Sequence, residues 1–330
     1  MRKNRIRKTG FWPLLTALAL AVGASASGPH GCITFPELPS PPAAVGALAL
    51  DPQGRVWFTN TATGALGRFD PATGELKEFP LRLRRAQPRG LVSDAQGRIW
   101  FTLGKQGRFG LFHPDTGRVR KFGAPSARDP EAILFGPDGR LWLAAPRANR
   151  LVRFNPKTYN LREFRLEGRD ARPTGLGAGP EGRIWFCLAG ASKLAAVEIA
   201  SGSITEYNTP AANAEPRRLA ADDDAIWVTE FRAGKLARFV PETETWQEWD
   251  SPSGPDSKPY GIATAADGSV WYAEAGAGRL VRFDPRSESF ETYSLPGARG
   301  IVRHLARAAN GTLWMAVESE NGGGRLARLD

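Results

Sequence analysis

The stretch Asp51-Pro52-Gln53-Gly54-Arg55-Val56-Trp57-Phe58-Thr59 decides the fold, because close copies of it recur along the chain. A second copy reads Asp94-Ala95-Gln96-Gly97-Arg98-Ile99-Trp100-Phe101-Thr102, and a more divergent one reads Gly179-Pro180-Glu181-Gly182-Arg183-Ile184-Trp185-Phe186. The tryptophan of this stretch occurs seven times, every 42 to 44 residues, at Trp57, Trp100, Trp142, Trp185, Trp227, Trp271 and Trp314. Self-similarity at a fixed period of this length indicates a repeat architecture.

Each repeat contains four runs of strand length, separated by turns rich in Gly, Pro and Asp. In the first repeat the runs are 46–50, 55–59, 65–69 and 75–79. Short β-branched and aromatic runs between such turns are typical of strands joined by hairpins. The pattern predicts an all-β, seven-bladed β-propeller with four-stranded blades. The repeated tryptophan is expected to pack between adjacent blades, because one aromatic side chain per blade buries a large area each time.

The two ends of the chain are expected to share the last blade. The seventh repeat stops at Asp330 after its third strand, so its fourth strand is missing. Residues 33–38, Ile-Thr-Phe-Pro-Glu-Leu, resemble the fourth strands of other repeats, such as 77–81 and 162–166. We therefore predict that 33–38 pair with the strand around 325–329, which closes the ring and leaves no open sheet edge.

The N-terminus predicts export. Five of the 44 basic residues precede residue 9, so removing residues 1–26 leaves 39 basic against 34 acidic residues. A basic start, an apolar run over 11–22 and the small residues Ala24-Ser25-Ala26 are typical of a secretory signal peptide. We expect cleavage after Ala26, one propeller domain over 27–330, and a periplasmic or secreted protein without a membrane span. An uncleaved anchor and a lipidated Cys32 are the alternatives. No basic run interleaved with aromatics remains to suggest nucleic-acid binding.

Candidate site residues are sought where the repeats differ, because the shared residues serve the scaffold. Ten or eleven residues before each tryptophan, at the entry to the innermost strand, the repeats carry Gly46, Arg89, Glu131, Thr174, Arg217, Tyr260 and His304. Three residues after it they carry Asn60, Leu103, Ala145, Leu188, Glu230, Glu274 and Val317, with Glu318 next in sequence. Both sets are expected to ring one mouth of the central channel, on the face formed by the loops that join fourth to first and second to third strands.

Titratable groups in these two sets favour a polar binding site. His304 is a candidate base, and Glu230, Glu274 and Glu318 are candidate acids or cation ligands. Arg89, Glu131 and Arg217, with Glu230 and Glu274, are the candidate substrate-binding residues. The alternative is a solvated funnel of compensating charges. The sequence has no glycine-rich phosphate loop opening a helix, no paired-cysteine zinc motif and no Gly-x-Ser-x-Gly nucleophile elbow.

The repeat text resembles the virginiamycin B lyase (streptogramin lyase) family. The likeness rests on Gly-Arg-Ile-Trp-Phe followed by segments such as Glu78-Phe79-Pro80, and on Pro88-Arg89-Gly90-Leu91, Pro173-Thr174-Gly175-Leu176 and Pro259-Tyr260-Gly261-Ile262. It covers residues 33–330. It implies a seven-bladed monomer that linearises cyclic depsipeptide antibiotics by elimination, in which a base removes a proton and Mg²⁺ stabilises the developing enolate charge.

Carried over by position, the resemblance places the base at His304, a nearby glutamate at Glu318 and a substrate contact at Tyr260. Three positions depart from the family pattern. The family's second histidine falls on Tyr260, an acidic residue two before the base falls on Val302, and a first-blade tyrosine falls on Gly46. Because Val302 replaces a carboxylate, Mg²⁺ is implied by the family while its ligands here stay unassigned.

Three function classes remain open. One is an exported carbon–oxygen lyase that opens a cyclic ester. Another is a non-catalytic exported propeller that binds a small molecule, a peptide or a protein partner. A lactone hydrolase of the gluconolactonase type is the third, and the seven regular repeats disfavour it because that type is usually six-bladed.

Overall fold

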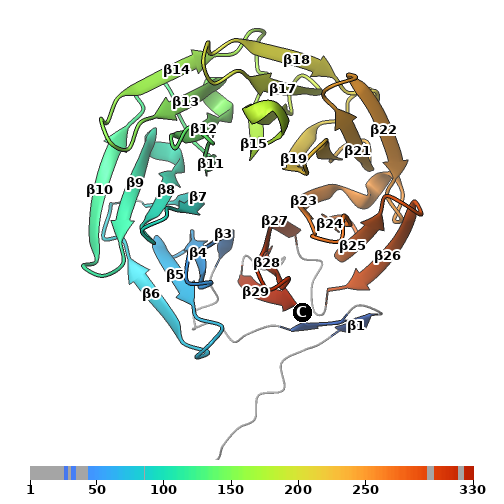
Figure 1. Cartoon of the computed structure of the whole chain (residues 1–330). Helices are drawn as coiled ribbons and strands as arrows, with labels where there is room; N and C mark the ends of the chain where they lie inside the picture. Colours follow the sequence, from blue (N-terminus) through green and yellow to red (C-terminus); the bar gives the residue numbers. More distant parts are fainter. Residues whose placement is uncertain (1–25, 29–30, 35–43, 85, 296–300, 319–322) are drawn as a thin grey trace, which may run out of the picture.

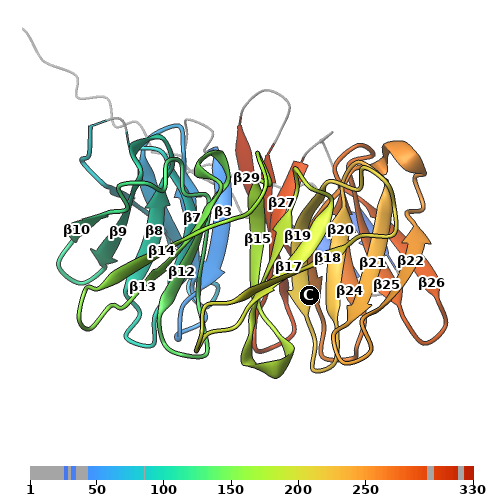
Figure 2. The same ribbon diagram turned by 90° about the horizontal axis from the view of Figure 1, so that it is seen from above.

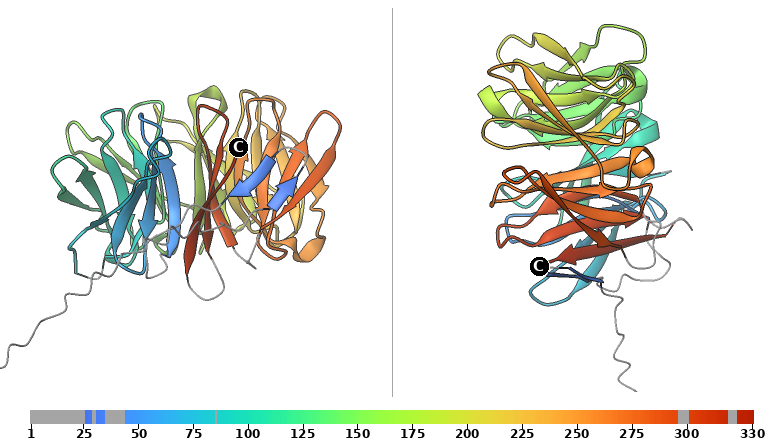
Figure 3. Two further views of the ribbon diagram at one scale, coloured as in Figure 1. Left: turned by 90° about the horizontal axis from the view of Figure 1, so that it is seen from below. Right: turned by 90° about the vertical axis from the view of Figure 1, so that its right-hand side faces the viewer.

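The chain forms a ring of seven antiparallel sheets around a central channel (Figure 1), as the repeats predict. The computed structural model describes residues 26–28, 31–34, 44–84, 86–295, 301–318 and 323–330. Figures 2 and 3 show the ring from its edge, with the strands running across the thickness of the disc. The predicted leader lies outside the described residues except for Ala26, and no helix in the described ranges is long and apolar enough to cross a membrane.

The first six blades each run from their innermost to their outermost strand in chain order. The first three are β3 (Val45–Leu50), β4 (Val56–Asn60), β5 (Ala65–Phe69) and β6 (Leu76–Pro80); β7 (Pro88–Ser93), β8 (Ile99–Leu103), β9 (Arg108–His113) and β10 (Arg118–Gly123); and β11 (Ala132–Phe135), β12 (Leu141–Ala145), β13 (Arg150–Phe154) and β14 (Leu161–Arg165). Blades four to six are β15 (Pro173–Ala178), β16 (Ile184–Leu188), β17 (Lys193–Val197) and β18 (Ile204–Asn208); β19 (Pro216–Ala221), β20 (Ile226–Glu230), β21 (Lys235–Val240) and β22 (Thr245–Asp250); and β23 (Pro259–Thr264), β24 (Val270–Glu274), β25 (Arg279–Asp284) and β26 (Ser289–Ser294). Short 3₁₀ turns at Gly104–Gln106, Pro146–Ala148, Pro180–Gly182 and Pro255–Ser257 interrupt the loops.

The seventh blade is assembled from both ends of the chain. It contains β27 (Ile301–Arg307), β28 (Leu313–Glu318) and β29 (Gly324–Leu329), followed by β2 (Gly31–Thr34) and β1 (Ala26–Gly28). β2 pairs antiparallel with β29, with Ile33 opposite Leu329, and the left view of Figure 3 shows these blue strands beside the C-terminus. The predicted closure is confirmed for Ile33 and Thr34, while 35–38 lie outside the described residues. Strand β1, which the sequence did not predict, adds a fifth strand.

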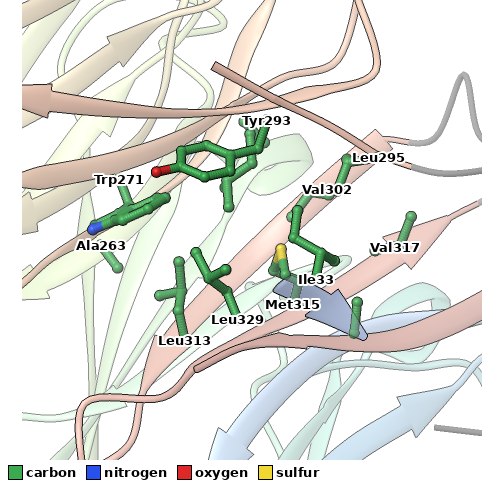
Figure 4. Close-up of a cluster of buried hydrophobic side chains, with 13 residues drawn as sticks. Ile33, Ala263, Trp271, Tyr293, Leu295, Val302, Leu313, Met315, Val317 and Leu329 are labelled. Carbon is green, nitrogen blue, oxygen red and sulfur yellow. The ribbon is translucent and has the colours of Figure 1, made fainter. Parts of the chain in front are cut away.

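The closing strand contributes a side chain to the core. Ile33 is fully buried among Val302, Met315 and Leu329 (Figure 4). Burying an isoleucine side chain stabilises a fold by about 1.5–3 kcal/mol. The ring is therefore held closed by apolar packing as well as by backbone pairing.

The seven repeated tryptophans pack between blades, as predicted. Trp57 belongs to one cluster with Ile99 and Phe101 of the next blade, and Trp314 packs against Val56 and Phe58 of the first blade. None of the seven is more than 8% exposed. Each blade interface thus contains one large aromatic side chain that excludes water along the seam.

The aspartate that opens the repeat serves as a hub for its turn. One carboxylate oxygen of Asp51 accepts hydrogen bonds from the backbone nitrogens of Gln53 and Arg55. The other accepts from Arg55 Nε at 2.6 Å and from Trp57 Nε1 at 2.8 Å. The spacing Asp-x-x-Gly-Arg-x-Trp therefore recurs because a single carboxylate fixes the turn, the arginine and the buried indole.

Candidate functional site

A polar cavity of about 430 Å³ lies at one mouth of the channel. It is on the predicted face, since its walls include the start of β3 and the β4–β5 loop. The charged and titratable side chains that line it are Arg89, Glu131, Arg218, Arg303, His304 and Glu318. The structure therefore brings together four predicted residues, Arg89, Glu131, His304 and Glu318, and adds Arg218 and Arg303.

Threonines of the second strands fix the backbone that carries these residues. Thr59 Oγ1 accepts from the nitrogen of Ala47 and donates to the carbonyl oxygen of Arg89 in the next blade, at 3.0 Å. Thr102 donates in the same way to the carbonyl of Glu131. Each of these two threonines joins its own innermost strand to that of the next blade, so the first three blades are hydrogen-bonded together at the channel mouth.

Arg218 and His304 occupy a position that other blades keep small. His304 is paired with Ala316 and Arg218 with Thr229, each two residues after the repeated tryptophan. At the corresponding position Gly90 lies so close to the next blade that an added Cβ would meet the carbonyl oxygen of Glu131 at 2.3 Å. The register between the first and second strands is irregular at this level in six of the seven blades, those of Arg218 and His304 included.

The side chains of Arg218 and His304 meet across the channel. Arg218 Nη2 lies 3.2 Å from His304 Nε2, and its Nε donates to the carbonyl oxygen of Arg303 at 3.3 Å. A guanidinium can only donate, so Nε2 of the imidazole is the acceptor and a neutral ring carries its proton on Nδ1. Burial, together with Arg218 and Arg303, holds the pKa of His304 well below its ordinary value.

Arg303 and Glu318 form the opposite wall of the cavity. Arg303 Nε donates to Glu318 Oε2 at 2.7 Å. Burial alone would lower the pKa of Arg303, but Tyr260 and Glu318 raise it above its usual value. Glu318 therefore neutralises Arg303, and no described hydrogen bond joins Glu318 to His304, where the family resemblance had suggested a direct partnership.

Tyr260 packs against two arginines of the site without lining the cavity. Its side chain is 4% exposed, and its ring centroid lies 5.3 Å from the guanidinium carbon of Arg218 and 5.4 Å from that of Arg303. Both distances are within the range of cation–π attraction. Tyr260 thus positions the guanidiniums of Arg218 and Arg303, and it would act on a substrate through these two arginines.

Glu131 is the acidic residue between the arginines of the mouth. Its carboxylate lies 3.8 Å from Arg89 Nη1 and 3.9 Å from Arg218 Nη2. Arg89 is also shared with Asp129, at 3.9 Å. Three guanidiniums thus face two lining carboxylates at distances too long for strong hydrogen bonds, except for the pair of Arg303 with Glu318.

The expectation that Glu230 and Glu274 ring the channel mouth is wrong. Side chains three residues after the tryptophans are at most 1% exposed. They lie on the second strand, whose side chains point toward neighbouring blades, while only the first strand borders the channel. Glu274 accepts hydrogen bonds from the backbone nitrogen and the hydroxyl of Ser253. Both carboxyl oxygens of Glu230 lack a hydrogen-bond partner among the described residues, and burial with Glu248 nearby raises its pKa to about 9.

Arg217 is not part of the cavity either. Its guanidinium lies over the ring of Phe231, 5.0 Å from the centroid, and is paired with Glu215. The next residue, Arg218, lines the cavity instead. The signal that could have identified Arg218 is a charged residue at a position where the sister repeats have Gly or Ala.

These side chains do not fit a magnesium site. Mg²⁺ takes oxygen ligands in near-octahedral geometry, mainly carboxylates and waters. Within the described ranges no group of three or more His, Cys, Asp or Glu side chains is arranged to share a cation. Val302 is buried in the apolar cluster of the seventh blade, and the nearest neighbours of His304 and Glu318 are arginines. A dication placed here would face three guanidiniums.

The chain is thus a seven-bladed β-propeller in which a cavity at one mouth of the channel contains a histidine. The chain belongs to the Virginiamycin B lyase family, whose model matches residues 21–252 and 159–329. The two matches overlap, as expected for a chain whose blades repeat. No curated protein sequence matches significantly.

Solved structures share the whole ring. A streptogramin B lyase structure superposes with a TM-score of 0.82 at 21% identity, covering 90% of this chain and 97% of the other. The virginiamycin B lyase of Staphylococcus aureus gives 0.82 at 22% identity, with 90% and 98% covered. A catalytically inactive histidine-to-alanine variant of that enzyme, with quinupristin, gives 0.81 at 22% identity over the same shares. At these identities the likeness establishes the fold.

Proposed function

We propose that the protein is an exported propeller that binds a compact ligand through an ester or carboxylate group at the channel mouth. The observation that carries this proposal is that Arg218 is buried without a close carboxylate partner. Its side chain is only 10% exposed, and the closest carboxylate among the described residues, Glu131, is 3.9 Å away. A buried guanidinium whose only close side-chain acceptor is a neutral imidazole is stabilised by an oxygen atom that accepts its hydrogen bonds with good geometry. A carboxylate or an ester carbonyl of a ligand supplies such an oxygen.

The first ligand to test is a cyclic depsipeptide of the streptogramin B type, because a family structure contains quinupristin. Calorimetry with quinupristin should show binding to the wild-type protein and at least tenfold weaker binding to Arg218→Met. Arg217→Met is the matched control, since Arg217 is adjacent in sequence but lies on Phe231 outside the cavity. Absence of wild-type binding, or equal losses in both variants, would overturn the proposal for this ligand.

Ring opening by elimination is the second candidate, and the position of His304 favours it. His304 is neutral, lies at the channel mouth and occupies the position of the family's base. When a ligand oxygen takes over Arg218, Nε2 of His304 becomes free to accept a proton. The proton comes from the carbon next to the one bearing the ester oxygen. Its electron pair forms the new C=C bond, and the carbon–oxygen bond breaks with release of a carboxylate.

In this mechanism the guanidiniums stabilise the negative charge that a metal would otherwise stabilise. The leaving group is a carboxylate, which arginine binds with two parallel hydrogen bonds. Mass spectrometry separates the two candidates, because elimination leaves a dehydrated open chain whose mass equals that of the cyclic substrate and whose fragments differ. Fragments of a linear product with the wild-type protein, lost in His304→Ala, support the lyase. Binding with only the intact ring recovered supports the ligand-binding propeller.

Export is part of the same proposal. Residues 1–26 have the basic, apolar and small-residue segments of a signal peptide. N-terminal sequencing of the protein recovered from the periplasm or medium should begin at Ser27. A chain that begins with a lipid-modified Cys32 would contradict it.

A further inference from the structure

A ring of aliphatic side chains lies in the channel beneath the polar cavity. Each blade contributes one residue, eight or nine positions before its tryptophan: Leu48, Leu91, Ile133, Leu176, Leu219, Ile262 and Leu305. Together they surround a second cavity of about 200 Å³. No charged residue occurs at this position in any repeat.

The small residues beside this ring keep the cavity narrow. Gly90 and Gly175 also line it, and an added Cβ at either would meet backbone atoms of the next blade within 3 Å. The innermost strands are therefore in close contact below the mouth, and the aliphatic side chains project into the remaining space.

The two cavities share one boundary. Arg218, Arg303 and His304 line both the cavity at the mouth and the cavity beneath it, where the aliphatic side chains form the rest of the wall. The contact between Arg218 Nη2 and His304 Nε2 is part of this boundary. A ligand group that takes Arg218 away from His304 would thus stand directly over the aliphatic ring.

We propose that the aliphatic ring is a binding site for the apolar tail of a short branched or aryl carboxylate whose head is held by Arg218. This inference rests on the proposed function, because it takes the carboxylate-binding role of Arg218 as given. A cavity of about 150 Å³ is large enough to bind benzene. By volume, the cavity of about 200 Å³ therefore accommodates a phenyl group or a branched chain of four or five carbons, with the carboxylate beside Arg218 at its upper boundary.

A series of carboxylates tests the head and the tail separately. Acetate, butanoate, 3-methylbutanoate and phenylacetate are titrated into the wild-type protein and followed by NMR or calorimetry. Each added methylene that enters the ring should strengthen binding about fourfold, so 3-methylbutanoate should bind roughly 50-fold more tightly than acetate. Equal affinities throughout the series would overturn the tail site while leaving the head site in place. Binding of none of the four would contradict the proposed function itself.

A filling variant provides the second arm. Leu176→Phe places extra volume in the ring and should remove the advantage of phenylacetate over acetate. Leu76→Phe is the matched control, because Leu76 lies on the outermost strand β6, outside both cavities. An undiminished advantage in Leu176→Phe would contradict the site.

If Leu176→Phe does not fold, the wild-type complex decides the question. Intermolecular NOEs from the phenylacetate ring to leucine and isoleucine methyls of the aliphatic ring would support the site. A bound ligand whose ring contacts only residues of the mouth would overturn it.

Discussion

Replacing Glu230 by glutamine should stabilise the protein increasingly as the pH rises. Glu230 is fully buried between two blades, both its oxygens lack partners in the described chain, and its pKa is raised to about 9 by burial and by Glu248. The folded protein therefore holds this proton where the unfolded chain, with an ordinary carboxyl pKa near 4.5, has released it.

The sign and size of the effect follow from this difference. A raised pKa contributes stability that is complete below pH 4.5 and is lost as the pH rises toward 9, because folding must then take up a proton. The loss is about 1.4 kcal/mol per pH unit, or about 4 kcal/mol between pH 5 and pH 8 as an upper limit. Glutamine is neutral at every pH and has nearly the same shape, so Glu230→Gln avoids the loss.

Urea unfolding of wild-type protein and variant at pH 5, 6, 7 and 8 measures the effect. The two stabilities should be similar at pH 5 and diverge steadily above it, with the variant more stable. Glu274→Gln is the matched control, because Glu274 has the equivalent place in the next blade but accepts two hydrogen bonds from Ser253. The free energy of unfolding of Glu274→Gln should be about 1–3 kcal/mol lower than that of the wild-type protein. Parallel pH curves for wild type and Glu230→Gln would refute the reasoning.

Three further predictions concern the scaffold and the site. Asp51→Ala should lower the free energy of unfolding by about 2–4 kcal/mol, because it leaves the indole N–H of Trp57 buried without an acceptor. The control Asp70→Ala leaves one backbone N–H without its acceptor at an exposed turn, and should cost far less in the same urea titration. Ile33→Ala should cost about 2–5 kcal/mol by opening a cavity in the closing blade, and a loss no larger than that of Thr34→Ala would argue against packing of the N-terminal strand. Arg218→Met should raise the pKa of His304 in an NMR titration of the imidazole protons, while Arg217→Met should leave it unchanged; equal titrations in both variants would contradict the pairing across the channel.

Repetition made the fold predictable. Seven tryptophans in equivalent positions define the blade, its strand order and the packing between blades, because each repeat forms the same strands and places its tryptophan at the same kind of interface. Closure was predictable from the missing fourth strand. The extra strand β1 was not, because Ala26–Gly28 has no β-branched or aromatic residue and forms only by pairing with β2.

Site residues could be predicted only where a position counted from the repeated tryptophan also has its side chain directed into the cavity. Arg89, Glu131 and His304 precede their tryptophans by ten or eleven residues on the innermost strand, and they do line the cavity. The same counting failed for Arg217, because the turn between β19 and β20 is one residue shorter than that between β27 and β28, so Arg218 and not Arg217 has the place equivalent to His304. It failed for Glu230 and Glu274 because a position on the second strand is screened from the channel by the first.

Val302, which departs from the family pattern, and Arg218 both act on the charge that the channel mouth can hold. A carboxylate beside the base would draw a cation into the site, and here Val302 contributes only apolar packing in that place. An arginine in contact with the base would repel the same cation, and here Arg218 lies 3.2 Å from the imidazole. Both features favour an anion over a cation in a channel of low dielectric constant, which is why we propose an oxygen acceptor of the ligand, and not a metal, as the partner of this site.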